Sequence, residues 1–186
     1  MKRIFDLSVS FCGLLVLLIP LLLIAFSIKL TSKGTILYWS NRVGKDNRIF
    51  KMPKFRTMRT DTPSVATHLL ENPDTYVTRI GRILRKSSLD ELPQLISIVK
   101  GDMSLVGPRP ALFNQDDLIE LRTRKGIHRL TPGLTGWAQI NGRDELPIPT
   151  KVEFDNYYLL HQSFSLDMKI ILRTVMKVIF RDGVTH

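Results

Sequence analysis

A single cysteine, Cys12, occurs in the 186 residues, so no internal disulfide can form. Its place in an apolar run indicates packing rather than reactivity, and the composition suits a reducing, cytosol-facing environment. The four histidines are scattered, without the Cys and His spacing of a zinc site. The glycine motifs of P-loops and of dinucleotide-binding folds are also missing. The sequence therefore gives no support to zinc, P-loop or dinucleotide chemistry.

Acidic residues are few, with 17 Asp and Glu against 27 Lys and Arg, so the formal net charge is +10. Such a surface favours polyanions, which include nucleic acid, anionic lipid head groups and phosphorylated small substrates. Aromatic residues do not alternate with the basic ones as they do in single-strand binders, which counts against nucleic acid. The length suits one domain with an accessory segment rather than two full domains.

The longest apolar run covers residues 11–28 and has 18 residues without a charge, the lower limit for spanning a bilayer. Lys2 and Arg3 precede it and two lysines follow, so both flanks carry the cationic mark of the cytoplasmic side. Pro20 lies in the middle, where it removes one helical hydrogen bond and clashes with the preceding turn. The residues alone leave two alternatives, a single-span anchor and a bent helix that enters and leaves on the same face.

The rest of the chain indicates short strands and helices around one core, which is an α+β fold. Two runs of β-forming residues separated by Gly, Asp and Asn predict a hairpin over residues 36–52. Gly101 predicts the end of a helix over residues 93–99, and a short buried strand is expected after it. We expect a polar surface excursion at residues 60–75 and an irregular Gly- and Pro-rich loop at residues 130–143.

Two basic amphipathic segments are expected, one at residues 76–86 and one in a C-terminal helix. In the latter, Ser165 is the expected N-cap, Asp167 favours the N-terminus, and Gly183 ends the helix. The basic stripe and the apolar face of this helix consist of Lys169, Arg173, Lys177 and Arg181, and of Met168, Leu172, Val175 and Ile179. Such a stripe fits a solvated face on a packing helix, and it also fits adhesion to anionic lipid.

Two adjacent acids in the stretch SSLDELPQL stand out in this cationic chain. Ser88 and Glu91 have the spacing of a helix capping box, which does not need Asp90. Near arginines and a helix N-terminus, such carboxylates are expected to be ionised, with lowered pKa values. They could bind Mg²⁺ or attack phosphorus as a nucleophile. The alternative is a capping box with a solvated neighbour.

Several cations are placed where they could grip phosphate. Lys54 and Arg56 are two residues apart and so lie on one face of an expected strand. Arg109 lies between two prolines that stiffen its backbone. Asn141 and Arg143 follow in the glycine-containing stretch INGR. Together with an acidic pair, these residues match the components of phosphoryl transfer: cations, a metal and a nucleophile.

Four motifs that follow the apolar segment resemble the bacterial sugar transferase family, the monotopic phosphoglycosyl transferases: KFRTM, LRKSSLDELPQL, KGDMSLVGPRP and PGLTGWAQINGR. The resemblance covers nearly the whole chain and fits the small form of the family, which is the catalytic unit alone. It implies transfer of a sugar 1-phosphate from a UDP-sugar to undecaprenyl phosphate, with release of UMP, to initiate surface glycan assembly. It also implies a re-entrant helix at residues 1–32, broken at Pro20, and a catalytic domain at residues 33–186. The location implied is the cytoplasmic face of the bacterial inner membrane.

The family's Asp-Glu dyad falls on Asp90 and Glu91. The resemblance implies that Asp90 attacks the β-phosphorus to give a covalent phosphosugar-aspartate, and that both acids hold Mg²⁺. Glu91 is expected to support the metal or to handle the proton on the polyprenyl phosphate. The expected substrate contacts are Lys54, Arg56, Arg109, Gln139, Asn141 and Arg143. Anionic membrane lipids are expected partners, nucleic acid is not, and a homo-oligomer stays open.

Two other hypotheses remain at this point. A basic membrane-anchored binding module would need the cations but not the acids, so Asp90→Asn would leave it functional. A UDP-sugar diphosphatase would use the same site with water in place of the lipid acceptor. Product analysis separates the diphosphatase from the transferase, because only the transferase makes a lipid-linked sugar diphosphate.

Overall fold

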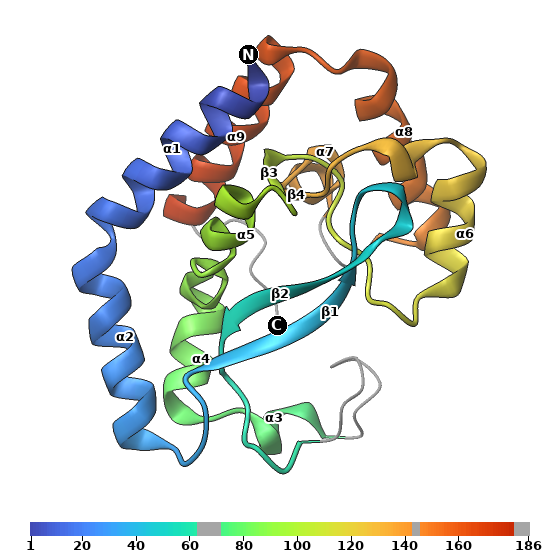
Figure 1. Ribbon diagram of the computed structural model, residues 1–186. Helices are drawn as coiled ribbons and strands as arrows, with labels where there is room; N and C mark the ends of the chain where they lie inside the picture. The colour runs from blue at the N-terminus through green and yellow to red at the C-terminus, as the bar shows by residue number, and fades with distance from the viewer. Residues whose placement is uncertain (63–71, 143–145, 181–186) are drawn as a thin grey trace.

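The computed structural model describes residues 1–62, 72–142 and 146–180 (Figure 1). The chain begins with two helices, α1 (Lys2–Val16) and α2 (Leu18–Thr31), which form a bent arm along one side of the molecule (Figure 1). Within the described ranges no single helix has both the length and the apolar composition to cross a membrane. The α1 and α2 pair meets these two criteria jointly, with a bend of 61° between the helices.

The bend in this arm is centred at Leu17, about one turn before Pro20. Pro20 explains this position, because it has no N–H to donate to the carbonyl of Val16, four residues earlier, and its ring crowds that carbonyl. The expected interruption of the apolar run is therefore present, although the helix breaks before the proline rather than at it.

The predicted hairpin is confirmed and is longer than expected. Strands β1 (Leu37–Val43) and β2 (Ile49–Phe55) pair antiparallel around η1 (Lys45–Asn47), in a register that runs from Leu37 opposite Phe55 to Val43 opposite Ile49. Asp46 and Asn47 turn the chain with φ angles of 54° and 59°, a left-handed conformation that short polar side chains tolerate.

A helical segment contacts β2 of the hairpin and contains the acidic pair. It consists of α3 (Pro73–Tyr76), α4 (Arg79–Lys86), the 3₁₀ turn η3 (Leu89–Glu91) and α5 (Gln94–Lys100). Thr78 caps α4 by accepting a hydrogen bond from the Gly81 N–H at 3.0 Å. Gly101 ends α5 with a φ of 99°, as its sequence position predicted.

The predicted short strand is also confirmed. It is β3 (Ser104–Val106), it is buried throughout, and it pairs in parallel with β4 (Gly133–Thr135). Residues 130–143 were expected to be irregular, but β4 and the short helix α7 (Trp137–Asn141) lie within them. Each of these two elements is five residues long or shorter, so the segment still lacks extended regular structure.

Three longer helices complete the described chain: α6 (Asp116–Arg124), followed by the 3₁₀ turn η4 (Ile127–Arg129), then α8 (Ile148–His161) and α9 (Phe164–Phe180). The expected cap of α9 at Ser165 is wrong, because the helix begins one residue earlier. Ser163 accepts the hydrogen bond from the Leu166 N–H instead, at 3.2 Å. Gly183, the expected end of this helix, lies outside the described residues.

The arm packs on the rest of the protein through hydrophobic clusters at both of its helices. One cluster takes most of its buried residues from α5 and β3, and side chains of α1, including Phe5 and Leu14, pack against it. In another, Ile28 of α2 is buried with Phe55 and Leu84. Helix α1 runs beside α9 (Figure 1), and Phe5 meets Phe164 edge to face with 5.3 Å between the ring centroids. The arm is therefore attached to the rest of the protein along both α1 and α2.

The surface of α9 mixes apolar and basic side chains. Ile170 faces the core, whereas Leu172 and Val175, which were expected to line an apolar face, are exposed beside Lys169 and Arg173. A helix that only packed on the core would bury these apolar residues. An exposed face that combines basic and apolar side chains is typical of a helix at a lipid interface.

Candidate functional site

The acidic pair lies on η3, in the sharp connection between α4 and α5. The predicted capping box is wrong, because Ser88 has a φ of 57° and its side chain makes no capping hydrogen bond. Glu91 does not turn back toward Ser88. It reaches instead toward two cations from distant segments of the chain.

Glu91 joins β2 to the loop that follows β3. Its Oε1 accepts a hydrogen bond from Lys54 Nζ at 2.6 Å and a second from Arg109 Nη2 at 2.8 Å. Arg109 Nη1 lies 3.4 Å from Oε2. The Glu91 side chain is only 20% exposed, so these charged hydrogen bonds are partly shielded from water.

The two neighbouring acids have opposite electrostatic environments. Burial alone would raise the pKa of Glu91, but the charges and hydrogen bonds of Arg109 and Lys54 hold it well below its ordinary value. Burial raises the pKa of Asp90, and the adjacent charge of Glu91 adds to this effect. Lys54, Arg85 and Arg109 oppose the rise without cancelling it. The expectation of a lowered pKa is therefore confirmed for Glu91 and wrong for Asp90.

Arg85 is a third cation of the site, although its sequence position indicated only a basic amphipathic segment at residues 76–86. Its Nε donates to Thr57 Oγ1 at 3.0 Å, and its charge acts on Asp90. Burial lowers the pKa of Arg85, while Asp90 and Asp74 counteract this. The available signal was its place in the last turn of a helix that ends just before the acidic pair.

Lys54 and Arg56 have hydrogen-bond partners in different parts of the structure. Strand β2 ends at Phe55, and the Arg56 guanidinium turns to the end of α2. Its Nη2 donates to the Ser32 carbonyl at 3.1 Å and to Ser32 Oγ at 2.8 Å, and its Nη1 donates to the Lys33 carbonyl. These carbonyls lie just after the last residue of α2, so Arg56 anchors the end of this helix. Its contact with the substrate stays a prediction.

The remaining expected contacts lie on or beside α7. Asn141 Nδ2 donates to the Trp137 carbonyl at 2.8 Å. The side-chain oxygen and nitrogen of Gln139 are buried and have no hydrogen-bond partner among the described residues. In the described part of the chain, no hydrogen bond joins either side chain to the acidic pair. Arg143 lies outside the described residues.

The acidic pair fits a metal that is shared with a substrate. No group of three or more His, Cys, Asp or Glu side chains with metal-binding geometry occurs among the described residues. Mg²⁺ commonly binds one or two carboxylates together with substrate phosphates, so such a group is not required. Within the same residues, no hydrogen bond occupies the Asp90 carboxylate. Its oxygens are thus available to a cation or to phosphorus.

A carboxylate under the influence of Lys54, Arg85 and Arg109 has the composition that a site for phosphate-bearing substrates would need. The bacterial sugar transferase model matches residues 1–181, and the chain belongs to this family. The family expected from the four motifs is thereby confirmed.

Among similar proteins, the uncharacterized sugar transferase EpsL of Bacillus subtilis is 40% identical over 99% of this chain and 90% of its own length. The undecaprenyl-phosphate glucose phosphotransferase of Komagataeibacter xylinus is 43% identical, with 96% of this chain and 36% of that protein covered. The UDP-glucose:undecaprenyl-phosphate glucose-1-phosphate transferase of Escherichia coli is 39% identical, with coverage of 95% and 40%. The chain thus spans nearly all of EpsL and about two fifths of the relatives whose names state a reaction.

Proposed function

We propose that this protein transfers a sugar 1-phosphate from a UDP-sugar to undecaprenyl phosphate, releases UMP and thereby initiates assembly of a surface glycan. The observation that carries the proposal is the available Asp90 carboxylate, surrounded by three cations and adjacent to an ion-paired Glu91. The substrate classes come from the names of the relatives. Those names include both glucose and N-acetylgalactosamine, so the sugar is a variable for experiment.

Asp90 is the proposed nucleophile. One of its carboxylate oxygens forms a bond to the β-phosphorus of the UDP-sugar, and the bond from that phosphorus to the bridging oxygen breaks. The electron pair leaves with UMP, and the sugar phosphate remains on Asp90. A carboxylate with a raised pKa is more basic than an ordinary aspartate, which favours attack, provided that it is ionised at the working pH.

The three cations allow one anion to approach another. Lys54, Arg85 and Arg109 counter the negative charge of the diphosphate, which would otherwise repel Asp90. Glu91 holds two of these cations in place, and its low pKa makes it a weak base. We therefore assign Glu91 to positioning Lys54 and Arg109 and not to proton transfer. Asp90 and Glu91 are the residues that would hold Mg²⁺, which would supply further charge neutralisation.

The second step regenerates the carboxylate. A phosphate oxygen of undecaprenyl phosphate forms a bond to the phosphorus held on Asp90, the bond from phosphorus to the aspartate oxygen breaks, and a lipid-linked sugar diphosphate is released. This acceptor resides in a bilayer. We propose that α1 and α2 form a re-entrant arm at the cytoplasmic face of the inner membrane, with the basic and apolar surface of α9 against anionic lipid.

UMP release tests the proposal directly. Purified protein in nanodiscs is supplied with Mg²⁺ and a panel of UDP-sugars, with and without undecaprenyl phosphate. We expect UMP release that depends on the lipid and is specific to one or a few sugars. Asp90→Asn and EDTA should each abolish it.

Two outcomes would reject the proposal. UMP release by the wild type that ignores the lipid would indicate a diphosphatase. Undiminished activity in Asp90→Asn would remove the nucleophile. Trapping a phosphosugar on the wild-type protein with UDP-sugar alone, and its loss in Asp90→Asn, would establish the covalent step separately from transfer.

A further inference from the structure

The segment Pro108-Arg109-Pro110 is attached to the protein through its carbonyl groups. Prolines have no N–H, so this segment has few backbone donors of its own. The Pro108 carbonyl accepts from the Gly133 N–H at 2.9 Å, and the Pro110 carbonyl accepts from Arg42 Nη1 at 3.1 Å. Between them, the carbonyl of Arg109 depends on a side chain from α6.

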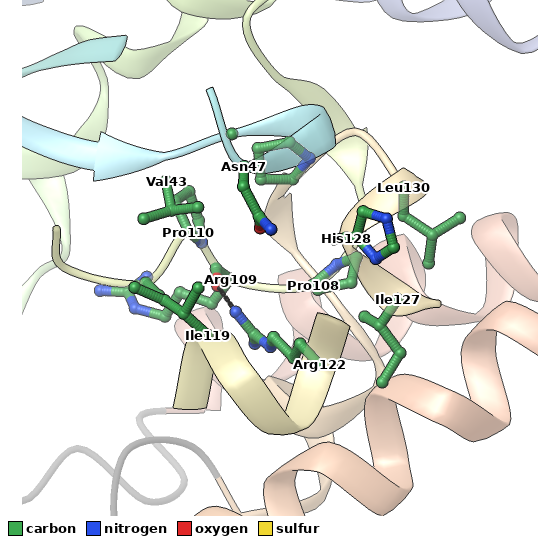
Figure 2. A pocket seen from close by; sticks show the side chains of 13 residues that line it. Val43, Asn47, Pro108, Arg109, Pro110, Ile119, Arg122, Ile127, His128 and Leu130 are labelled. Carbon is green, nitrogen blue, oxygen red and sulfur yellow. Dashed lines mark hydrogen bonds between the residues drawn. The ribbon is translucent and has the colours of Figure 1, made fainter. Parts of the chain in front are cut away.

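That side chain is Arg122. Figure 2 shows its guanidinium extending from α6 toward the backbone of Arg109. Nη1 donates to the Arg109 carbonyl at 2.8 Å, while Nε and Nη2 donate to Asp155 Oδ2 of α8, at 3.0 and 2.6 Å. A planar guanidinium can make both sets of bonds at once. We call this arrangement the fork: Nε and Nη2 bind Asp155, while Nη1 binds the Arg109 carbonyl. A lysine ammonium cannot reproduce it.

The pair of Arg122 and Asp155 is almost fully removed from water. Their side chains are 10% and 2% exposed. A buried ion pair often contributes little to stability compared with apolar residues of similar volume, so stability alone does not explain its presence here. Among the described residues that line the hollow next to it, which include Val43, Asn47, Pro108 and His128, there is no second carboxylate for Arg122 (Figure 2).

We propose that Arg122, oriented by Asp155, is a positioning residue for Arg109. The fork fixes the backbone carbonyl of Arg109 from one side, while Glu91 holds its guanidinium from the other. The side chain that meets the substrate diphosphate is therefore fixed at both ends. The connection runs from α8 through α6 to the acidic pair, and its catalytic consequence depends on the proposed function. Positioning errors of about 1 Å cost about 100-fold in rate.

Two changes separate positioning from stability. Arg122→Lys keeps a positive charge beside Asp155 but loses the fork. The double variant Arg122→Met with Asp155→Leu replaces the buried pair by apolar residues of similar size, which commonly preserves folding. We expect both variants to lower kcat/KM for the UDP-sugar about 10- to 100-fold. The double variant should unfold at a midpoint near that of the wild type. Arg124→Lys is the matched control, since Arg124 lies on the same helix in an exposed pair with Glu120.

The split between KM and kcat gives a readout that a purely structural role would not move. Because Arg109 is proposed to meet the substrate diphosphate, a displaced Arg109 should change KM for the UDP-sugar, whereas a loss of folded protein lowers only the apparent kcat. Wild-type activity in the double variant, or a wild-type KM in Arg122→Lys with a kcat that follows the folded fraction, would overturn the positioning role.

A stability cycle tests the same connection without catalysis, and so stays informative if the wild type releases no UMP. Arg122 and Glu91 share Arg109 as a common neighbour. If Arg122 orients Arg109, Glu91→Gln should lower the unfolding midpoint less in the Arg122→Lys background than in the wild type. Midpoint shifts that simply add would refute the positioning role, whereas an inactive wild type with coupled shifts would reject only the proposed function.

Discussion

Replacing Asp90 and Glu91 by their amides, one at a time, should change stability in opposite directions, although both replacements should impair transfer. Glu91→Gln removes the counter-charge of Lys54 and Arg109, whose side chains are 17% and 29% exposed. Each charged hydrogen bond contributes about 1.5–3 kcal/mol, and the amide oxygen can still accept one of them. We therefore expect a loss of about 3 kcal/mol, which for a chain of this size lowers the unfolding midpoint by about 6–12 °C.

The opposite effect is expected for Asp90→Asn. Burial and the charge of Glu91 raise the pKa of Asp90 in the folded protein, so its ionised form disfavours folding at neutral pH. Removing that charge should raise the midpoint by a few degrees, as is common where a functional site carries unfavourable charge. This gain should shrink as the pH falls and the wild-type Asp90 becomes protonated.

The pH dependence for Glu91 has the opposite sign. Its pKa is lower in the folded protein than in the unfolded chain, so its contribution is fully present above the unfolded value, about 4.3. That contribution is lost as the pH falls through the folded pKa. Thermal unfolding in nanodiscs with EDTA, at neutral and acidic pH, measures both effects. Asp102→Asn is an exposed control, and a drop for Asp90→Asn equal to that for Glu91→Gln would refute this electrostatic account.

One further pH measurement and two substitutions have expected outcomes. The acid limb of kcat/KM for UMP release should lie above the ordinary aspartate pKa of about 3.9, because burial raises the pKa of Asp90. Pro20→Ala restores a donor for the Val16 carbonyl, so spin labels at the outer ends of α1 and α2 should move apart as the 61° bend opens. In Gly81→Ala, the new Cβ would lie 2.0 Å from the Thr57 carbonyl oxygen, so the unfolding free energy should fall by about 1–3 kcal/mol.

Elements that are set by turn and capping residues within a few positions of each other could be predicted from the sequence. The hairpin follows from β-forming runs around Asp46 and Asn47, and α5 ends where Gly101 takes a left-handed conformation. Helix α8 was not predicted, because its buried face includes Asp155 and the hydroxyl-bearing Tyr158. Polar members interrupt the apolar period from which such a helix is recognised.

Site residues that stand in a distinctive motif could be predicted from the sequence. Side chains whose partners come from distant segments of the chain could not. Asp90, Glu91 and Arg109 could be selected from the sequence. Strand alternation was expected to place Arg56 beside Lys54, but β2 ends at Phe55 and the Arg56 guanidinium bonds to Ser32. Ser88 and Glu91 do not form a capping box, because Glu91 pairs with Lys54 instead. Lys54 lies 37 positions away, and a helix-start pattern contains only neighbouring residues.

Because α1 is attached to the elements around the site, the orientation of the arm determines where the site lies. Asp6 is buried and accepts hydrogen bonds from Ser104 Oγ at 2.7 Å and from the Leu105 N–H at 3.3 Å, on the strand that leads to Arg109. Arg3 donates to the carbonyls of the last turn of α5, the helix that follows the acidic pair. Both sides of the site are thus tied to the first two turns of α1. If α1 enters the membrane as proposed, its depth and tilt set the height of Asp90 relative to the lipid phosphates, because side-chain hydrogen bonds join α1 directly to α5 and β3.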